Sequence, residues 1–197
     1  MPRKRRKDVI LSRAEQVEAL ASPVRHRIHL ALEMLGPVSV RELAVWMERE
    51  PESLYYHIRR LVAVGVVVEH GSRRWGTREE KVYCLSGERV RLDPRQSSPA
   101  FLRGFARGAR TLLRYASRCL VRALEDSRAR RHGPSRNTRI EQVHIRLNAA
   151  KLDELHRRLD VLQAFLAEND DSGLDHALVV TVAVSPVFES GHSNSRD

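Results

Sequence analysis

The spacing of apolar residues changes at Gly65, and this change constrains the fold more than any other feature of the sequence. Before Gly65, apolar residues recur every three or four positions, which is the spacing of amphipathic helices. After it, two β-rich runs at 66–70 and 81–85 bracket a polar tip that contains Gly71 and Gly76. These two runs predict a β-hairpin with a long loop.

Capping residues and prolines mark where the helices before Gly65 begin. The signals are Ser12 with Glu15, Ser39 with Glu42, Pro23 and Pro51. They predict helices over about 13–20, 23–35, 40–47 and 51–64, with Leu35 and Val62 among the residues that face the core. Three helices, the last two joined by a tight turn, followed by a hairpin predict a winged helix-turn-helix, whose second paired helix lies in the DNA major groove.

The chain is strongly basic, and its charge is unevenly distributed. Its 197 residues carry 35 Lys and Arg against 25 Asp and Glu, a formal charge of +10. Residues 1–99 hold 19 basic and 13 acidic side chains (+6), 100–138 hold 10 and 2 (+8), and 139–197 hold 6 and 10 (−4). A basic front and middle suit a module that faces a polyanion, and the acidic end suits a module that faces another partner.

Composition also bears on the compartment. No apolar run approaches the roughly 20 residues of a membrane helix, and residues 1–7 form a basic cluster with no apolar stretch behind it. Cys84 and Cys119 are too few for a disulfide framework, which suits packed thiols in a reducing compartment. We therefore expect a cytoplasmic, nucleoid-associated protein with no membrane partner.

The sequence pattern divides the chain into six segments. They are a basic disordered tail over 1–11, a winged helix-turn-helix domain over 12–86, a linker over 87–98, a long dimerisation helix over 99–132, a strand-helix-strand unit over 139–185 and a flexible tail over 186–197. The expected fold class is α+β, and mainly α.

The predicted long helix carries two parallel ridges. The basic ridge consists of Arg103, Arg107, Arg110, Arg114, Arg118 and Arg122. It forms a solvated face, follows the DNA backbone, or pairs with the acidic C-terminal unit. The apolar ridge beside it is typical of a dimer interface and includes Leu102, Phe105, Gly108, Leu112, Ala116 and Leu120.

The segment 139–185 is interpreted as a strand, a helix and a second strand. Apolar residues alternate with polar ones at 143–147, Asn148 suits a helix cap, five leucines at helical spacing follow it, and 177–184 is an apolar run. Two strands are too few to be stable alone, so the unit either completes a sheet across a dimer or docks on the long helix. A sensor of an unknown small-molecule or protein effector is a further hypothesis for this unit.

Several consecutive stretches resemble one protein family. They are Leu20-Ala21-Ser22-Pro23-Val24-Arg25, Val38-Ser39-Val40-Arg41-Glu42-Leu43-Ala44, Leu54-Tyr55-Tyr56-His57-Ile58-Arg59-Arg60-Leu61 and Gly65-Val66-Val67. Over about residues 10–86 the chain is similar to bacterial and archaeal winged-helix regulators of the ArsR type. The resemblance implies a homodimer, formed through a helix after the wing, that binds a double-stranded DNA operator and acts as a repressor rather than an activator.

The fourth predicted helix buries Leu54, Ile58 and Leu61, so its opposite face is expected to meet DNA. The residues expected to contact base edges are Ser53, Tyr55 and Tyr56, with Arg59 and Arg60 reaching a base or a phosphate. The residues expected on the DNA backbone or in the minor groove are Arg73, Arg74 and Arg78 at the wing tip and Ser39 and Arg41 before it. The family resemblance implies a half-buried, packed imidazole at His57.

The sequence carries no motif for catalysis or metal binding. The stretch 42–47 lacks the cysteine pair of metalloid-sensing members of the ArsR type, and His26 and His29 are interpreted as surface residues. Metalloprotease, Walker, nucleophile-elbow and dinucleotide-binding patterns are all missing. We expect no enzyme, no cofactor and no metal. The alternative function is an architectural or nonspecific nucleic-acid-binding protein, driven by the basic ridge and the basic tail.

Overall fold

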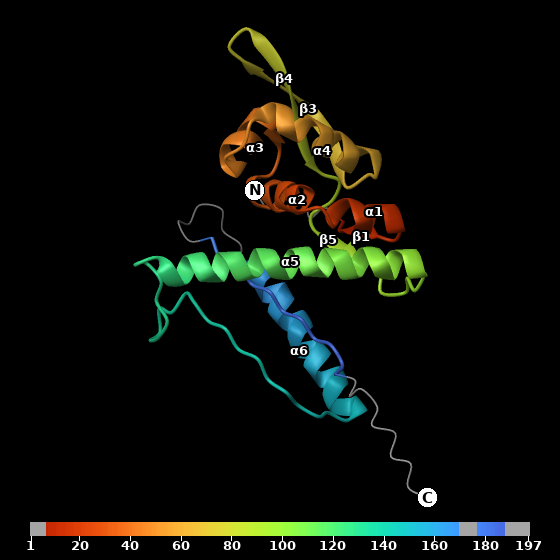
Figure 1. Cartoon of the computed structure of the whole chain (residues 1–197), viewed down its shortest axis with the longest axis vertical. Coiled ribbons are helices and arrows are strands. Elements are labelled where there is room, and N and C mark those ends of the chain that lie inside the picture. The colour runs from red at the N-terminus through yellow and green to blue at the C-terminus, as the bar shows by residue number, and fades with distance from the viewer. Residues whose placement is uncertain (1–6, 170–176, 188–197) are drawn as a thin grey trace, which may run out of the picture.

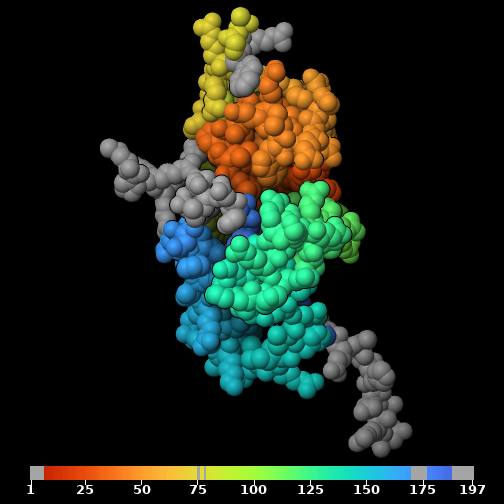
Figure 2. All heavy atoms as spheres, turned by 90° about the vertical axis from the view of Figure 1, so that its left-hand side faces the viewer, coloured from red at the N-terminus to blue at the C-terminus, as the bar shows by residue number. Residues whose placement is uncertain are grey.

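The long helix α5 (Pro99–Glu125) divides the molecule into two parts, as Figure 1 shows. The structure is a computed structural model that describes residues 7–169 and 177–187. It is an α+β protein in which about half of the chain is helical. Helices α1–α4 and a projecting hairpin lie on one side of α5, and α6 lies on the other (Figures 1 and 2). Among the described residues, no helix combines the length and the apolar character needed to cross a membrane.

Four helices on one side of α5 enclose the core. They are α1 (Ala14–Leu20), α2 (Pro23–Leu35), α3 (Val40–Met47) and α4 (Pro51–Ala63). Ile28, Leu43, Leu54, Ile58 and Leu61 are each at most 1% exposed. Their helical spacing brings them to the inner faces of α2, α3 and α4, so the predicted apolar pattern is confirmed for these helices.

The start of α3 is fixed by the predicted capping box. The Ser39 hydroxyl accepts from Glu42 N at 3.2 Å, and Glu42 Oε2 accepts from Ser39 N at 2.6 Å. The predicted cap at Ser12 is wrong: α1 is capped at Arg13 instead. There Gln16 Oε1 accepts from the backbone N–H groups of both Ser12 and Arg13, each at 3.1 Å.

Two residues predicted to face the core are exposed instead. Leu35 is 42% exposed, because it is the last residue of α2 and the chain turns away at Gly36, whose φ is 72°. Val62 is 38% exposed. It follows Leu61 by one position, and one helical step rotates its side chain about 100° away from the buried line.

A three-stranded antiparallel sheet contains the predicted hairpin. The strands are β2 (Val38–Ser39), β3 (Val67–Trp75) and β4 (Arg78–Leu85), in the order β2-β4-β3. The predicted long loop is wrong, because the strands extend until only Gly76 and Thr77 connect them. The outer part is polar, and its strands pair Arg73 with Glu80 and Arg74 with Glu79, so opposite charges replace the missing apolar pattern.

Two segments that were expected to lack regular structure form a second, parallel pair of strands. β1 (Val9–Leu11) lies in the segment predicted as a disordered tail, and β5 (Val90–Leu92) lies in the predicted linker. Val9 N donates to Arg89 O at 2.7 Å, and Val9 and Leu11 are buried. Runs of three residues are too short to be recognised by periodicity before their partner is known. Residues 1–6 and 188–197, which hold most of the two predicted tails, lie outside the described residues.

Helix α5 is attached to α1 at its first half. Phe101, Gly104 and Thr111 are its buried residues, and the Thr111 hydroxyl donates to Ala21 O at 2.7 Å. A Cβ on Gly104 would lie 3.5 Å from Val17, which shows how closely the two helices approach. The helix ends at Glu125 rather than near residue 132, because Asp126 adopts an extended conformation with ψ 130°.

The C-terminal part contains the predicted helix but not the predicted strands. Helix α6 (Ala149–Glu168) begins at Asn148, whose Oδ1 accepts from Lys151 N at 3.0 Å, as predicted. Residues 139–147 and 177–187 form no strand in the part of the chain that the structure describes. A strand requires a neighbouring strand to pair with, and neither segment belongs to a sheet among the described residues.

Candidate nucleic-acid interface

The outward face of α4 is rich in tyrosine and arginine. Tyr55 is 48% and Tyr56 62% exposed, and Arg59 and Arg60 are also exposed. These side chains lie opposite the buried Leu54, Ile58 and Leu61 because α4 is a regular helix of 13 residues. The predicted outward face of this helix is therefore present in the structure.

Ser53 lies in the first turn of α4 and is exposed. Its hydroxyl donates to Glu50 O at 2.7 Å and so closes the turn before the helix. The hydroxyl oxygen keeps lone pairs that a donor on a ligand would reach.

A tight connection orients α4 relative to α3. Helix α3 ends at Met47, and the residue that caps it, Glu48, adopts the left-handed conformation with φ 54°. Arg49 N donates to Ala44 O at 2.9 Å, which closes the end of α3. Pro51 then begins α4, so only three residues separate the two helices.

Two residues outside the predicted set, Arg25 and Tyr83, adjoin this face. Burial lowers the pKa of the Arg25 guanidinium. The charges of Tyr56 and Arg60 also act on this pKa. Burial also raises the pKa of Tyr83 on β4. The charges of Tyr55 and Arg59 are among those that act on this pKa. Sequence reasoning missed both residues because their proximity to α4 depends on how α2 and β4 pack.

His57 is half-buried beside Tyr56, with 5.4 Å between the ring centroids. Its pKa is lowered, first by burial and then by the charges of Arg25 and Arg49. The side chain is thus a packed, predominantly neutral imidazole near pH 7, as the family resemblance implies.

The hairpin projects at the same end of the molecule as α3 and α4 (Figure 1). Arg73 and Arg74 lie on β3 and are exposed, and Arg78 begins β4, with its side chain outside the described part of the structure. Arg73 Nη1 lies 2.7 Å from Glu42 Oε1 at the start of α3. This ion pair joins the hairpin to α3 across the exposed surface.

The start of α3 is less available to a ligand than predicted. Arg41 Nε lies 2.9 Å from Glu80 Oε1 on β4, and the Arg41 side chain remains 51% exposed. Ser39 is only 4% exposed, and its hydroxyl caps α3. The predicted backbone contact from the Ser39 side chain therefore does not fit this structure, because the hydroxyl is used inside the fold.

The predicted dimerisation residues of α5 lie at or near the surface. Leu102, Phe105 and Leu112 are 48%, 44% and 40% exposed, Ala116 and Leu120 are half-buried, and Gly108 borders open space. The basic ridge of α5 is exposed along its whole length. One member, Arg107, pairs with Glu18 on α1 rather than with the acidic C-terminal part.

The prediction that His26 and His29 are surface residues is wrong. His26 is 9% exposed and lies 5.8 Å from the ring of Tyr115 on α5, and the His29 side chain is 12% exposed. Burial, followed by the charge of His26, lowers the pKa of His29 to about 4. His26 lies where α2 packs on α5, and the His29 ring lies beside it with 6.0 Å between the ring centroids, which a single amphipathic stripe does not reveal.

Within the described residues, no three His, Cys, Asp or Glu side chains cluster in a way that would hold a metal ion. Cys84 is buried and Cys119 half-buried, as expected for packed thiols. The exposed tyrosines and arginines of α4 offer ionic contact, hydrogen bonding and stacking by aromatic side chains.

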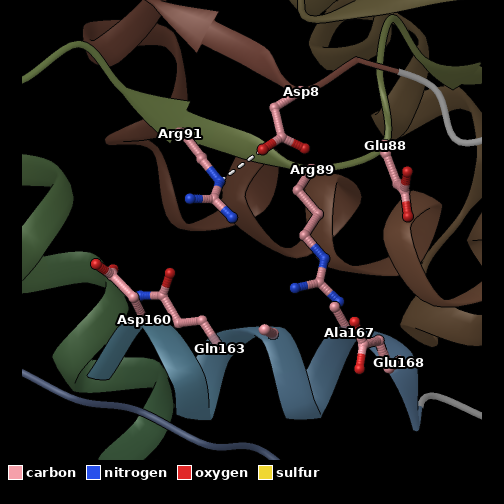
Figure 3. A pocket seen from close by; sticks show the side chains of 9 residues that line it. Asp8, Glu88, Arg89, Arg91, Asp160, Gln163, Ala167 and Glu168 are labelled. Carbon is pink, nitrogen blue, oxygen red and sulfur yellow. Dashed lines mark ion pairs between the residues drawn. The ribbon is translucent and has the colours of Figure 1, made fainter. Parts of the chain in front are cut away.

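A cavity of about 550 Å³ lies between the β1–β5 pair and the C-terminal end of α6 (Figure 3). Charged residues from both sides line it, among them Asp8, Arg89, Arg91, Asp160 and Glu168. Arg91 Nε pairs with Asp8 Oδ2 at 2.6 Å. The lining mixes both signs of charge.

Comparison of the chain with models of protein families finds no match, and comparison with curated proteins finds none either.

Proposed function

We propose that this protein is a homodimeric, sequence-specific DNA-binding regulator of transcription in which residues 12–86 act as a winged helix-turn-helix. The exposed tyrosine and arginine face of α4 beside the projecting hairpin is the observation that carries this proposal. The resemblance to ArsR-type regulators favours a repressor. As such a regulator it would act in the cytoplasm, associated with the nucleoid.

The arrangement of α3 and α4 supports this proposal. A three-residue connection holds the helices together, and among the described residues no element covers Tyr55, Tyr56 and Arg59 on α4. An α-helix fits the major groove, where each base pair shows a distinct set of donors and acceptors. Arginine reads guanine there with two hydrogen bonds, and tyrosine hydroxyls donate or accept.

The hairpin supplies contacts with the DNA backbone that would fix the position of α4 along the duplex. Arg73 and Arg74 are exposed on a strand beyond the helices, where they would reach phosphates or a narrow minor groove. The formal charge of +10 adds a general attraction to DNA.

A second copy would present the same face to a second half-site. Leu102, Phe105 and Leu112 of the apolar ridge of α5 are exposed, and a twofold axis would pair this ridge with its own copy. Two half-sites about 34 to 36 Å apart would then form a palindromic operator.

Selection from a random duplex library, followed by competition against unrelated duplex, tests the proposed function. The expected outcome is one enriched, palindromic sequence that binds about a thousandfold or more tightly than unrelated DNA at fixed salt. A preference below about tenfold would contradict it.

That contradicting outcome would favour the second candidate, an architectural or nonspecific nucleic-acid-binding protein. The exposed basic ridge of α5 is the observation in its favour. Such a protein binds through phosphates alone and so shows a steep salt dependence without a preferred sequence.

A further inference from the structure

The C-terminal part exposes an unusual amount of apolar side chain. We call residues 139–147, helix α6 and residues 177–187 the C-terminal segments. Their exposed large apolar residues are Ile140, Val143, Ile145, Leu152, Val161, Leu162, Phe165, Leu178, Val179, Val180, Val182, Val184 and Val187. Helix α6 buries none of its 20 residues. Soluble proteins rarely leave so large an apolar surface uncovered, so this surface marks an interaction site.

The pattern of residues 177–184 is that of a strand buried on both faces. Leu178, Val180, Val182 and Val184 share one face, and Val179 lies on the other face together with alanine and threonine. All of these apolar side chains are at least half exposed in this chain. A strand of this kind is found inside a sheet whose two faces are both covered.

Residues 142–147 have the complementary, one-sided pattern. Val143, Ile145 and Leu147 alternate with polar residues, and Val143 is 74% and Ile145 66% exposed. Such a strand has one apolar face to cover and one face for solvent. With the amphipathic α6, the C-terminal segments contain the parts of a small sheet with a helical cover.

We propose that a second copy of this chain covers this surface, with residues 177–184 of the two copies pairing antiparallel in one sheet shared between them. The two α6 helices would cover one face of this sheet. The inference rests on the homodimer in the proposed function but places a second contact away from α5.

The absence of charge in the strand favours a second copy over an unrelated partner. Residues 177–187 carry no ionisable side chain, so they offer no charge pattern by which to select a different protein. An uncharged, unpaired strand pairs readily with its own copy, and a twofold axis makes identical strands antiparallel.

The size of the surface also agrees with a stable dimer. Stable interfaces use about 20 to 30 residues on each side. One face of the 20-residue helix α6, together with the two extended segments 139–147 and 177–187 of 9 and 11 residues, would supply a number in this range. The surface is thus large enough without any contribution from α5.

Sedimentation of the full chain in the absence of DNA tests this inference. The expected mass is twice the 22.6 kDa of one chain. Val182→Asp places a charge in the shared sheet and, combined with Leu112→Asp to remove the α5 contact, should return the mass to that of one chain, whereas Leu112→Asp alone should leave it doubled. Val45→Asp is the matched control, because Val45 is 77% exposed on α3, and it should leave the mass doubled.

Hydrogen exchange identifies the contact itself. The amides of 178–184 should be protected in the wild type at high concentration and lose protection on dilution, as the mass falls. A monomeric wild type, a dimer of the Val182→Asp, Leu112→Asp double variant, or a dimer in which these amides exchange freely would overturn the inference. Protection that persists in the monomer would also overturn it, because the strand would then pair within one chain.

Neither measurement contains DNA, so the shared sheet and the sequence-specific binding to DNA are tested separately. A dimer with protected strands and no preferred operator would contradict only the proposed function. A preferred operator bound by a chain that keeps its doubled mass in Val182→Asp, and loses it in Leu112→Asp, would contradict only the shared sheet.

Discussion

Arg59 is the residue whose substitution most directly tests the proposed contact of α4 with DNA bases. It is exposed on the outward face of α4, beside Tyr55 and Tyr56. We expect Arg59→Ala to reduce discrimination between the selected operator and single-base variants by about 1 to 3 kcal/mol at one position. Fluorescence anisotropy with a series of labelled duplexes measures this change.

Arg157→Ala is the matched control for Arg59. Arg157 is an exposed arginine of α6 that pairs with Glu154, on the other side of α5. It should leave both affinity and base preference unchanged. Equal effects of the two substitutions would show that Arg59 contributes only general charge.

His29 makes stability depend on pH. Its pKa falls from 6.5 to about 4 in the folded protein, because of burial and of His26, so the unfolded chain binds the proton more readily. The free energy of unfolding is therefore highest above pH 6.5 and falls as the pH drops toward 4, by about 2 kcal/mol between pH 8 and pH 5. Urea unfolding at a series of pH values measures it.

The groups around His29 determine how strongly stability depends on pH, and a variant of His29 provides the control. Glu33 Oε2 lies 3.5 Å from His29 Nε2 and would partly compensate a protonated ring, so 2 kcal/mol is an upper value. The pKa of His26 is lowered by burial and by Arg118, so His26 acts in the same direction. His29→Leu should flatten the pH dependence, and an unchanged slope in that variant would assign the effect elsewhere.

The hairpin, as an element, should contribute affinity rather than sequence preference. Replacing both Arg73 and Arg74 by Ala should weaken binding to every duplex alike and reduce the slope of log affinity against log salt by about 1 to 2. Titrations at several salt concentrations with operator and unrelated DNA test this. A loss confined to the operator would instead make these arginines base readers.

The substitution Glu42→Gln on α3 tests the ion pair that holds Arg73 of the hairpin. Glu42 both caps α3 and pairs with Arg73, so that pair must break before Arg73 reaches a phosphate. Glutamine keeps an oxygen for the cap and removes the charge. This substitution should therefore tighten binding to all duplexes, and weaker binding would mean that the pair positions Arg73 for DNA.

How far each element could be predicted depends on where its partners lie. The start of α3, the prolines of α2 and α4, and the cap of α6 are local signals, and the structure confirms them. Strands β1 and β5 are three residues each and were missed, because only their parallel pairing makes them recognisable. The strands predicted over 139–185 are wrong for the described residues, because an alternating pattern does not show whether a neighbouring strand is present.

The same distinction holds for the candidate interface. The outward residues of α4 follow from helical periodicity, so Tyr56 and Arg59 were placed correctly on the surface. The burial of Ser39 and His26, and the position of Arg25 beside α4, depend on packing between elements. Periodicity within one element carries no information on such contacts.

For the molecule as a whole, two copies on one operator would fix the spacing of the half-sites. If the dimer is rigid, inserting about five base pairs between half-sites turns one of them to the opposite face of the duplex. Binding should then fall toward that of a single half-site, and an insertion of about ten should restore part of it. Equal affinity for all three spacings would mean that each copy binds independently.

The pairing of β1 with β5 has a practical consequence for anyone who shortens the chain. From the sequence, truncation to residue 12 would appear harmless, because it removes only the segment predicted as a basic disordered tail. It would in fact delete β1, uncover Val90 and Leu92, and take away the carbonyl of Leu11 that accepts from Asp93 N at 3.0 Å. Expression trials should therefore retain the chain from residue 7 onward and carry any affinity tag ahead of it.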